Sequence, residues 1–90
     1  GEVLQYNGRD IVLPDIRIVY WAGGNPFHHH QDLPRLQRAW ARAETVVVQE
    51  PWWTAVARHA DIVLPATTTL ERNDIASSSR DRFVRAMHQA

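Results

Sequence analysis

Between residues 16 and 66, short apolar stretches rich in β-branched residues alternate with stretches typical of helices, and no other feature constrains the fold as strongly. The strand-like stretches are residues 16–21, 45–49 and 62–64, and the helix-like stretches are residues 33–43 and 54–60. Short apolar strands that alternate with helices favour a parallel sheet joined by right-handed crossovers. The sequence therefore predicts an α/β fold whose parallel sheet runs in β-α-β-α-β order.

The stretch after Asp32 is the best-defined helix in the sequence. Asp32 suits the N-cap position, and Pro34 suits the first helical turn. A single apolar stripe then follows at spacings of three and four residues, as an amphipathic helix requires. The stripe consists of Leu33, Leu36, Trp40 and Ala43.

The segments on either side of this unit follow other patterns. Residues 1–15 read as a hairpin-like lead-in, because the pair Asn7-Gly8 separates two short apolar stretches. Residues 67–90 read as a polar loop and tail, in which residues 82–87 fit either a strand or the start of a helix. We therefore divide the chain into the lead-in 1–15, the β-α-β-α-β unit 16–66 and the tail 67–90.

Composition excludes several classes of function. Ten basic residues balance ten acidic ones, which argues against binding nucleic acid through bulk charge, because neutralising phosphates needs an excess of cations. The longest apolar run, Ile18–Ala22, is far shorter than the roughly 20 residues that cross a bilayer, so we expect no membrane insertion. The chain has no cysteine, which excludes disulfides and thiolate metal sites within it. Its abrupt start at Gly1 suggests a fragment. The sequence does not decide whether the protein belongs to the cytoplasm or to the periplasm.

Three segments that could bind a ligand follow the three predicted strands, at residues 23–26, 49–50 and 67–72. In an open parallel sheet, ligands bind beyond the carboxyl ends of the strands. A glycine such as Gly24 lets a phosphate approach the backbone, and an acid that ends the next strand, here Glu50, can accept hydrogen bonds from ribose hydroxyls. This Rossmann-like arrangement is compatible with a nucleotide site, but the third glycine of the dinucleotide fingerprint is missing. The alternative is a tight turn before a helix and an ordinary solvated glutamate.

Other residues with chemical potential have simpler explanations. The adjacent histidines His28–His30 cannot converge on one metal ion from a regular element. We expect them on a surface loop, or one of them as a neutral hydrogen-bond donor to a ligand, with metal binding as the lesser alternative. Glu71 and Asp74 could form a pair for acid–base work, but capping or solvation is the better explanation in a polar loop. Trp52 and Trp53 could stack on a planar ligand, yet paired tryptophans at a helix start more often seal a core.

Residues 20–32, 44–50 and 58–74 closely resemble three blocks of the dimethyl sulfoxide reductase family, in the same order and with similar spacing. The blocks read YWAGGNPFHHHQD, ETVVVQE and RHADIVLPATTTLERND. The biotin sulfoxide and trimethylamine N-oxide reductases are the members that the blocks resemble most. The family consists of molybdenum enzymes that carry two molybdopterin guanine dinucleotides, and the resemblance covers a small internal part of a typical member.

The resemblance implies a piece of one dinucleotide-binding α/β domain and matches Asn25, His29, Gln49, Glu50 and Arg72 to cofactor-binding residues of the family. With Gly24 of the glycine turn, these residues form the predicted cofactor-binding set. In the family, the asparagine and histidine of the first block contact the cofactor, the glutamine–acid pair addresses the guanosine, and the arginine beyond the third strand also touches the cofactor. Many members have aspartate where this chain has Glu50. The molybdenum-ligating serine of the family lies outside this segment, so none of these residues is expected to be catalytic, and none is expected to bind a metal.

Two hypotheses about function follow. In the first, the chain is part of a molybdenum oxidoreductase that reduces small S-oxides or N-oxides by oxygen-atom transfer. This segment then binds the guanosine and phosphate part of the cofactor and is inactive without the remainder of the enzyme. The second is a stand-alone nucleotide-binding or interaction module without redox activity. Parallel strands need cover on both faces and only two helices are evident, so we also expect exposed apolar surface and self-association of the fragment.

Overall fold

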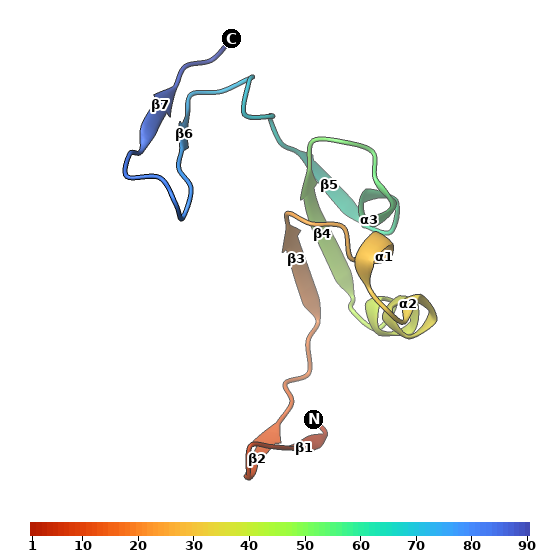
Figure 1. Cartoon of the computed structure of the whole chain (residues 1–90). Helices are drawn as coiled ribbons and strands as arrows, with labels where there is room; N and C mark the ends of the chain where they lie inside the picture. Colours follow the sequence, from red (N-terminus) through yellow and green to blue (C-terminus); the bar gives the residue numbers. More distant parts are fainter.

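The computed structural model describes all residues, 1–90, and confirms the predicted α/β fold. Its centre is a parallel sheet in the order β3-β4-β5. The bounds of these strands are β3 Ile18–Ala22, β4 Thr45–Glu50 and β5 Ile62–Pro65. Two helices, α1 (Pro26–His29) and α2 (Leu33–Trp40), connect β3 to β4, and α3 (Ala55–Arg58) connects β4 to β5 (Figure 1).

The helices α2 and α3 begin at side chains that accept hydrogen bonds from backbone N–H groups of the first turn. The Asp32 carboxylate accepts a hydrogen bond from the Arg35 amide at 3.1 Å, and α2 ends at Trp40, three residues before the predicted end. The Thr54 hydroxyl accepts a longer bond from the Ala57 amide at 3.5 Å and so caps α3. The four-residue helix α1 was not predicted, because so short a segment carries no apolar periodicity.

Hairpins flank the sheet at both ends of the chain. The first consists of β1 (Val3–Tyr6) and β2 (Arg9–Val12), and the second of β6 (Asp74–Ala76) and β7 (Arg85–Met87). Figure 1 shows the two hairpins at opposite ends, away from the central sheet. The radius of gyration is 17.6 Å, whereas a compact domain of this length has about 12 Å. The chain therefore has the shape of a partial domain.

The core lies on one face of the sheet only. Val46 and Val48 of β4 pack with Val56 of α3, and all three are buried. The side chains packed around them are Val19, Trp21, Phe27, Trp40, Ala43 and Ala60. Figure 1 shows the three helices on this same side of the sheet.

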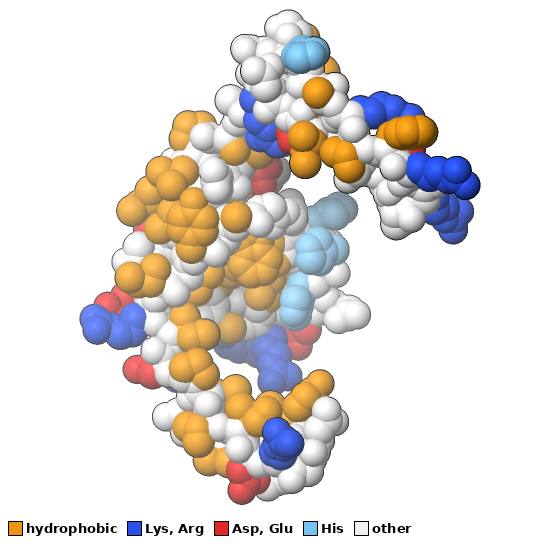
Figure 2. Space-filling model, turned by 90° about the vertical axis from the view of Figure 1, so that its left-hand side faces the viewer, with side chains coloured by type: hydrophobic (Ala, Val, Ile, Leu, Met, Phe, Trp, Pro, Cys, Tyr) orange, Lys and Arg blue, Asp and Glu red, His pale blue; other side chains and the backbone are white.

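The other side of the sheet, the open face, carries apolar side chains that nothing covers. Its exposed members are Ile18, Tyr20, Ile62 and Leu64. Figure 2 shows hydrophobic side chains gathered over the middle of the molecule, between the two hairpins. Because parallel sheets are normally covered on both faces, this sheet lacks one of its layers.

The tryptophans divide between the core and the surface. Trp21 and Trp40 contact each other in the packed layer, with ring centroids 5.5 Å apart. Trp52 and Trp53 are 66% and 65% exposed. The expectation that this pair seals the core was therefore wrong: it lies between β4 and α3, where no element covers it.

Candidate functional site

A shallow cavity of about 440 Å³ lies at the carboxyl ends of the three parallel strands. It forms there because the register pairs Ala22 with Gln49 and Glu50 with Pro65, so the segments that follow the strands leave the sheet at one edge. Its lining residues are Ala22, Gly23, Gln49, Pro51, Ala66, Thr67, Thr68, Thr69 and Arg72. The cavity thus brings together Gln49 and Arg72, two of the predicted site residues, beside the glycine turn.

The glycine turn after β3 depends on backbone conformations that other residues rarely adopt. Gly23 and Gly24 have φ angles of +85° and +73°, in the left-handed region that favours glycine. A Cβ atom on Gly23 would meet no atom within 4 Å. Glycine is therefore required here by the turn itself, and the backbone beside the cavity stays uncovered.

Asn25 follows the turn at the start of α1 and holds an unpaired polar atom. Its backbone carbonyl accepts the amide of His28 at 3.0 Å, but its side chain makes no capping bond. The side-chain Oδ1 is buried and has no hydrogen-bond partner in the chain. Buried acceptors in native proteins are nearly always paired, so this atom suits a donor that the chain does not supply.

His29 is held near the same turn by the aromatic packing of α1. Phe27 stacks on His59 with ring centroids 3.9 Å apart and meets Trp40 edge-on at 5.0 Å. This packing sets the position of α1, and the His29 Nε2 lies 3.9 Å from the place that a Cβ of Gly24 would occupy. His29 therefore lies against the glycine turn, outside the lining of the cavity.

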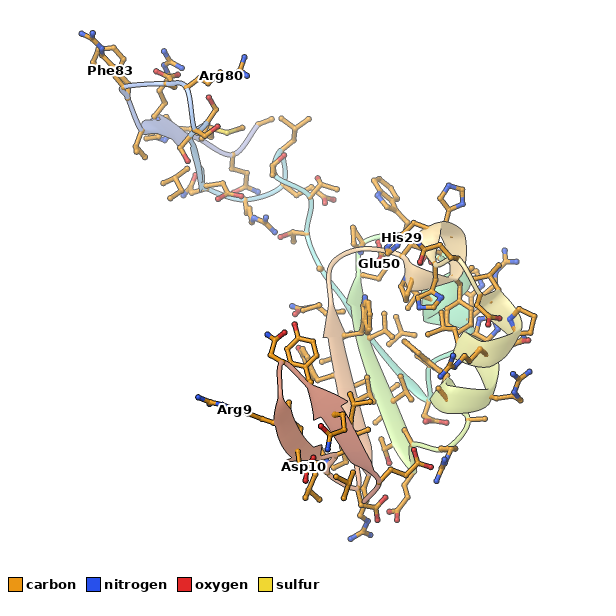
Figure 3. The ribbon with its side chains drawn as sticks, turned by 60° about the horizontal axis from the view of Figure 1, so that its bottom comes forward. Arg9, Asp10, His29, Glu50, Arg80 and Phe83 are labelled. Atoms are coloured by element: carbon orange, nitrogen blue, oxygen red, sulfur yellow. The ribbon has the colours of Figure 1, made fainter.

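Gln49 and Glu50 leave β4 on opposite faces, because successive side chains of a strand alternate. Gln49 lies on the open face, where its Oε1 accepts the Tyr20 hydroxyl at 3.1 Å. Glu50 is half-buried and points to the face that carries the helices. Figure 3 shows Glu50 and His29 at the same end of the sheet. Gln49 and Glu50 therefore lie on opposite faces of the sheet at this edge and do not share one groove.

Arg72 is tied into the loop that it belongs to. Its Nε donates to Asp74 Oδ2 at 2.9 Å, and its Nη1 donates to the Thr67 carbonyl at 2.7 Å. These bonds hold the guanidinium at the rim of the cavity, while the side chain stays 46% exposed. An arginine fixed in this way can present its remaining N–H groups to a phosphate or carboxylate.

The two carboxylates of this loop act as hydrogen-bond acceptors. The amide and hydroxyl of Thr68 donate to Glu71 at 2.7 and 2.9 Å and lower the pKa of Glu71. The Ile75 amide, and after it Arg72, lowers the pKa of Asp74. Both groups are therefore ionised at neutral pH, which fits loop capping and does not fit a general acid.

Sequence reasoning missed Tyr20, whose hydroxyl contacts Gln49 beside the cavity. The threonines Thr67–Thr69 of the lining lie in the predicted segment 67–72. The strand alternation could have found Tyr20, because residues of paired parallel strands that share a face are predictable from the register.

A larger cavity of about 610 Å³, between the lead-in and α2, contains none of the predicted site residues. No group of three or more metal-ligating side chains comes together anywhere in the chain. None of the helices is both long enough and apolar enough to span a membrane.

Comparison with known proteins gives consistent matches. The family model described as "Molybdopterin oxidoreductase" matches residues 6–90. The chain is 60% identical over 90 residues to a biotin sulfoxide reductase of Cereibacter sphaeroides. The aligned residues are 100% of this chain and 12% of that protein. It is 60% identical over 77 residues to a dimethyl sulfoxide/trimethylamine N-oxide reductase of the same organism, with 86% and 9% covered. It is 59% identical over 75 residues to a trimethylamine-N-oxide reductase of Haemophilus influenzae, with 83% and 9% covered. The chain thus spans about a tenth of the length of these relatives.

Proposed function

The chain belongs to the molybdopterin oxidoreductase family, and from that premise we propose that it is part of a molybdenum enzyme that reduces S-oxides or N-oxides by oxygen-atom transfer. The similar proteins are named as reductases of biotin sulfoxide, dimethyl sulfoxide and trimethylamine N-oxide. The partners of the segment are then the remainder of the enzyme chain and a small oxide substrate.

Within this enzyme, the segment binds the guanosine and phosphate part of molybdopterin guanine dinucleotide. The observation that carries this proposal is the cavity at the carboxyl ends of β3, β4 and β5, which Gln49 and Arg72 line together. This edge is where open parallel sheets hold nucleotides. Gly24, Asn25, His29 and Glu50 lie around the same edge, on the turn, on α1 and at the end of β4.

The donors and acceptors of these residues suit a dinucleotide. Arg72 supplies a fixed cation for a phosphate. Gln49 supplies an amide that its bond to Tyr20 orients. The unpaired Oδ1 of Asn25 supplies an acceptor for an N–H or O–H of the cofactor. Glu50 and His29 supply further polar groups for the ribose or the phosphates.

Oxygen-atom transfer, with its two electrons and two protons, is chemistry that the bound molybdenum cofactor supplies. The residues of this segment bind and orient the nucleotide end of that cofactor. None of them would touch the reacting atoms, so none is catalytic.

The open face argues against a stand-alone module. An independent parallel sheet would leave Ile18, Ile62 and Leu64 in water, and covering such a face is normally the task of helices in the same domain. The two hairpins, which do not pack on the sheet (Figure 1), also fit a segment whose neighbours belong to a longer chain.

Two substitutions in the full-length reductase test the binding role. Arg72→Gln removes the charge and most of the N–H groups, and Gln49→Ala removes the oriented amide. Loss of one charge-assisted hydrogen bond weakens binding by roughly tenfold to a hundredfold. We therefore expect purified Arg72→Gln enzyme to contain less bound cofactor, measured as GMP released by acid hydrolysis per enzyme.

Arg80→Gln is the matched control, because Arg80 lies in the distant β6–β7 hairpin (Figure 3). The control should keep the GMP content of the parent enzyme. An unchanged GMP content in both Arg72→Gln and Gln49→Ala would show that this edge does not hold the dinucleotide.

A further inference from the structure

Tyr20 has a polar contact that neither the fold nor the core requires. It lies in the middle of β3, on the open face, among the apolar side chains of the sheet. Its hydroxyl donates to Gln49 Oε1 at 3.1 Å across the two strands. Tyr20 pairs with Val47 in the register, so Gln49 is two residues further along the same face and within reach of a tyrosine side chain.

This contact fixes an amide that lines the cavity. A glutamine side chain has three rotatable bonds and an amide with a donor end and an acceptor end. The Tyr20 hydroxyl donates to Oε1, and Gln49 lines the cavity, so its Nε2 end is the one that is left for a ligand. A side chain held by a neighbour loses less conformational freedom when a ligand binds.

From these observations we propose that Tyr20 is a positioning residue, which acts through Gln49 to present its Nε2–H groups to an acceptor atom of the guanosine. This inference rests on the proposed binding of the dinucleotide and adds a donor specificity to it. Since the bond to Tyr20 engages Oε1 and leaves the Nε2–H groups unpaired, a nucleoside that offers an acceptor at this point is favoured.

A double-mutant cycle in the full-length holoenzyme tests the coupling. Tyr20→Phe removes one hydroxyl and keeps the ring on the open face, while Gln49→Ala removes the amide. The measured quantity is the rate at which the purified holoenzyme loses its nucleotide cofactor, followed as GMP in the protein fraction after dilution. We expect Tyr20→Phe to accelerate this loss about three- to tenfold and to have no further effect in the Gln49→Ala background.

If Tyr20→Phe acted only by destabilising the fold, its effect on the rate of cofactor loss would not depend on Gln49. Tyr6→Phe, on the exposed strand β1, is the matched control and should leave the rate unchanged. If the effects of Tyr20→Phe and Gln49→Ala multiply in the double variant, Tyr20 does not act through Gln49 and the inference is wrong. It is equally wrong if Tyr20→Phe has no effect while Gln49→Ala and Arg72→Gln do, an outcome that leaves the proposed function standing. If none of the three variants loses cofactor faster, the proposed function fails as well.

Discussion

Asp61 holds the start of β5 against the start of β4, and its removal should destabilise the central sheet measurably. Its Oδ2 accepts the Val46 amide at 2.8 Å, and its own amide donates to the Val46 carbonyl at 2.9 Å. Val46 is only 2% exposed, so water cannot easily replace the carboxylate as the partner of this amide. Asp61→Ala therefore leaves a buried donor without an acceptor.

The magnitude follows from the kind of bond that is lost. A hydrogen bond to a charged acceptor contributes about 1.5–3 kcal/mol, so Asp61→Ala should lower the free energy of unfolding by about 2 kcal/mol. Asp61→Asn keeps an oxygen acceptor without the charge and should cost about 1 kcal/mol, because charged hydrogen bonds are roughly twice as strong as neutral ones.

Urea denaturation of the 90-residue chain, kept dilute to limit self-association through the open face and followed by tryptophan fluorescence, measures these differences. Trp21 and Trp40 lie in the packed layer and report its unfolding. With a denaturant dependence of about 1–2 kcal/mol per M, Asp61→Ala should lower the urea midpoint by about 1–2 M. Asp15→Ala, which removes an exposed carboxylate of the lead-in, should leave the midpoint unchanged. An Asp61→Ala midpoint equal to that of the parent chain, or equal to that of Asp61→Asn, would refute the reasoning.

Three further outcomes are expected. Val48→Ala removes two methyl groups from a fully buried site and should cost about 2–3 kcal/mol in the same assay; an unchanged midpoint would contradict a core on the helix-covered face. The chain should self-associate through the open face, and Ile18→Glu should reduce the association seen by light scattering; a monomeric parent chain at high concentration would oppose this. The Thr68 hydrogen bonds lower the pKa of Glu71, so their stabilisation is complete above the ordinary value of 4.5 and is lost as the pH falls through the lower folded pKa. The chemical shift of the Thr68 amide proton should accordingly change with pH around a midpoint below 4.5. A midpoint at or above 4.5 would count against the hydrogen bond between Thr68 and Glu71.

The central sheet could be predicted because its signals are local. Runs such as Val46–Val48 have no competing helical periodicity, and Asp32 and Thr54 mark the helix starts with side chains that cap them. The carboxyl-edge site followed from the same pattern, since parallel strands send their following segments to one edge. The assignment of individual site residues needed the family resemblance, because glycines, a glutamine and an arginine after strands occur in many folds.

The rest could not be predicted because it depends on contacts between distant residues. The strands β6 and β7 have three residues each and pair across a long polar loop, which leaves no alternation to detect. The exposure of Trp52 and Trp53 could not be predicted either, because two adjacent tryptophans give the same sequence pattern whether they are buried in a core or exposed to water. The sequence of a parallel strand is apolar on both faces, so it does not reveal which face this chain covers by itself.

Different parts of the chain form the core of the sheet and the edge that is proposed to bind the cofactor. The edge is built from two left-handed glycines, the Thr68–Glu71 loop and the bond between Tyr20 and Gln49 across β3 and β4. The core is one-sided, with its other apolar face open. Tyr20 connects the edge to the open face, since its ring lies on that face and its hydroxyl donates to Gln49 at the edge. Any element that covers the open face would therefore also restrain the ring whose hydroxyl orients Gln49, so folding of the surrounding domain and readiness of the site to bind a nucleotide should be coupled through this one side chain.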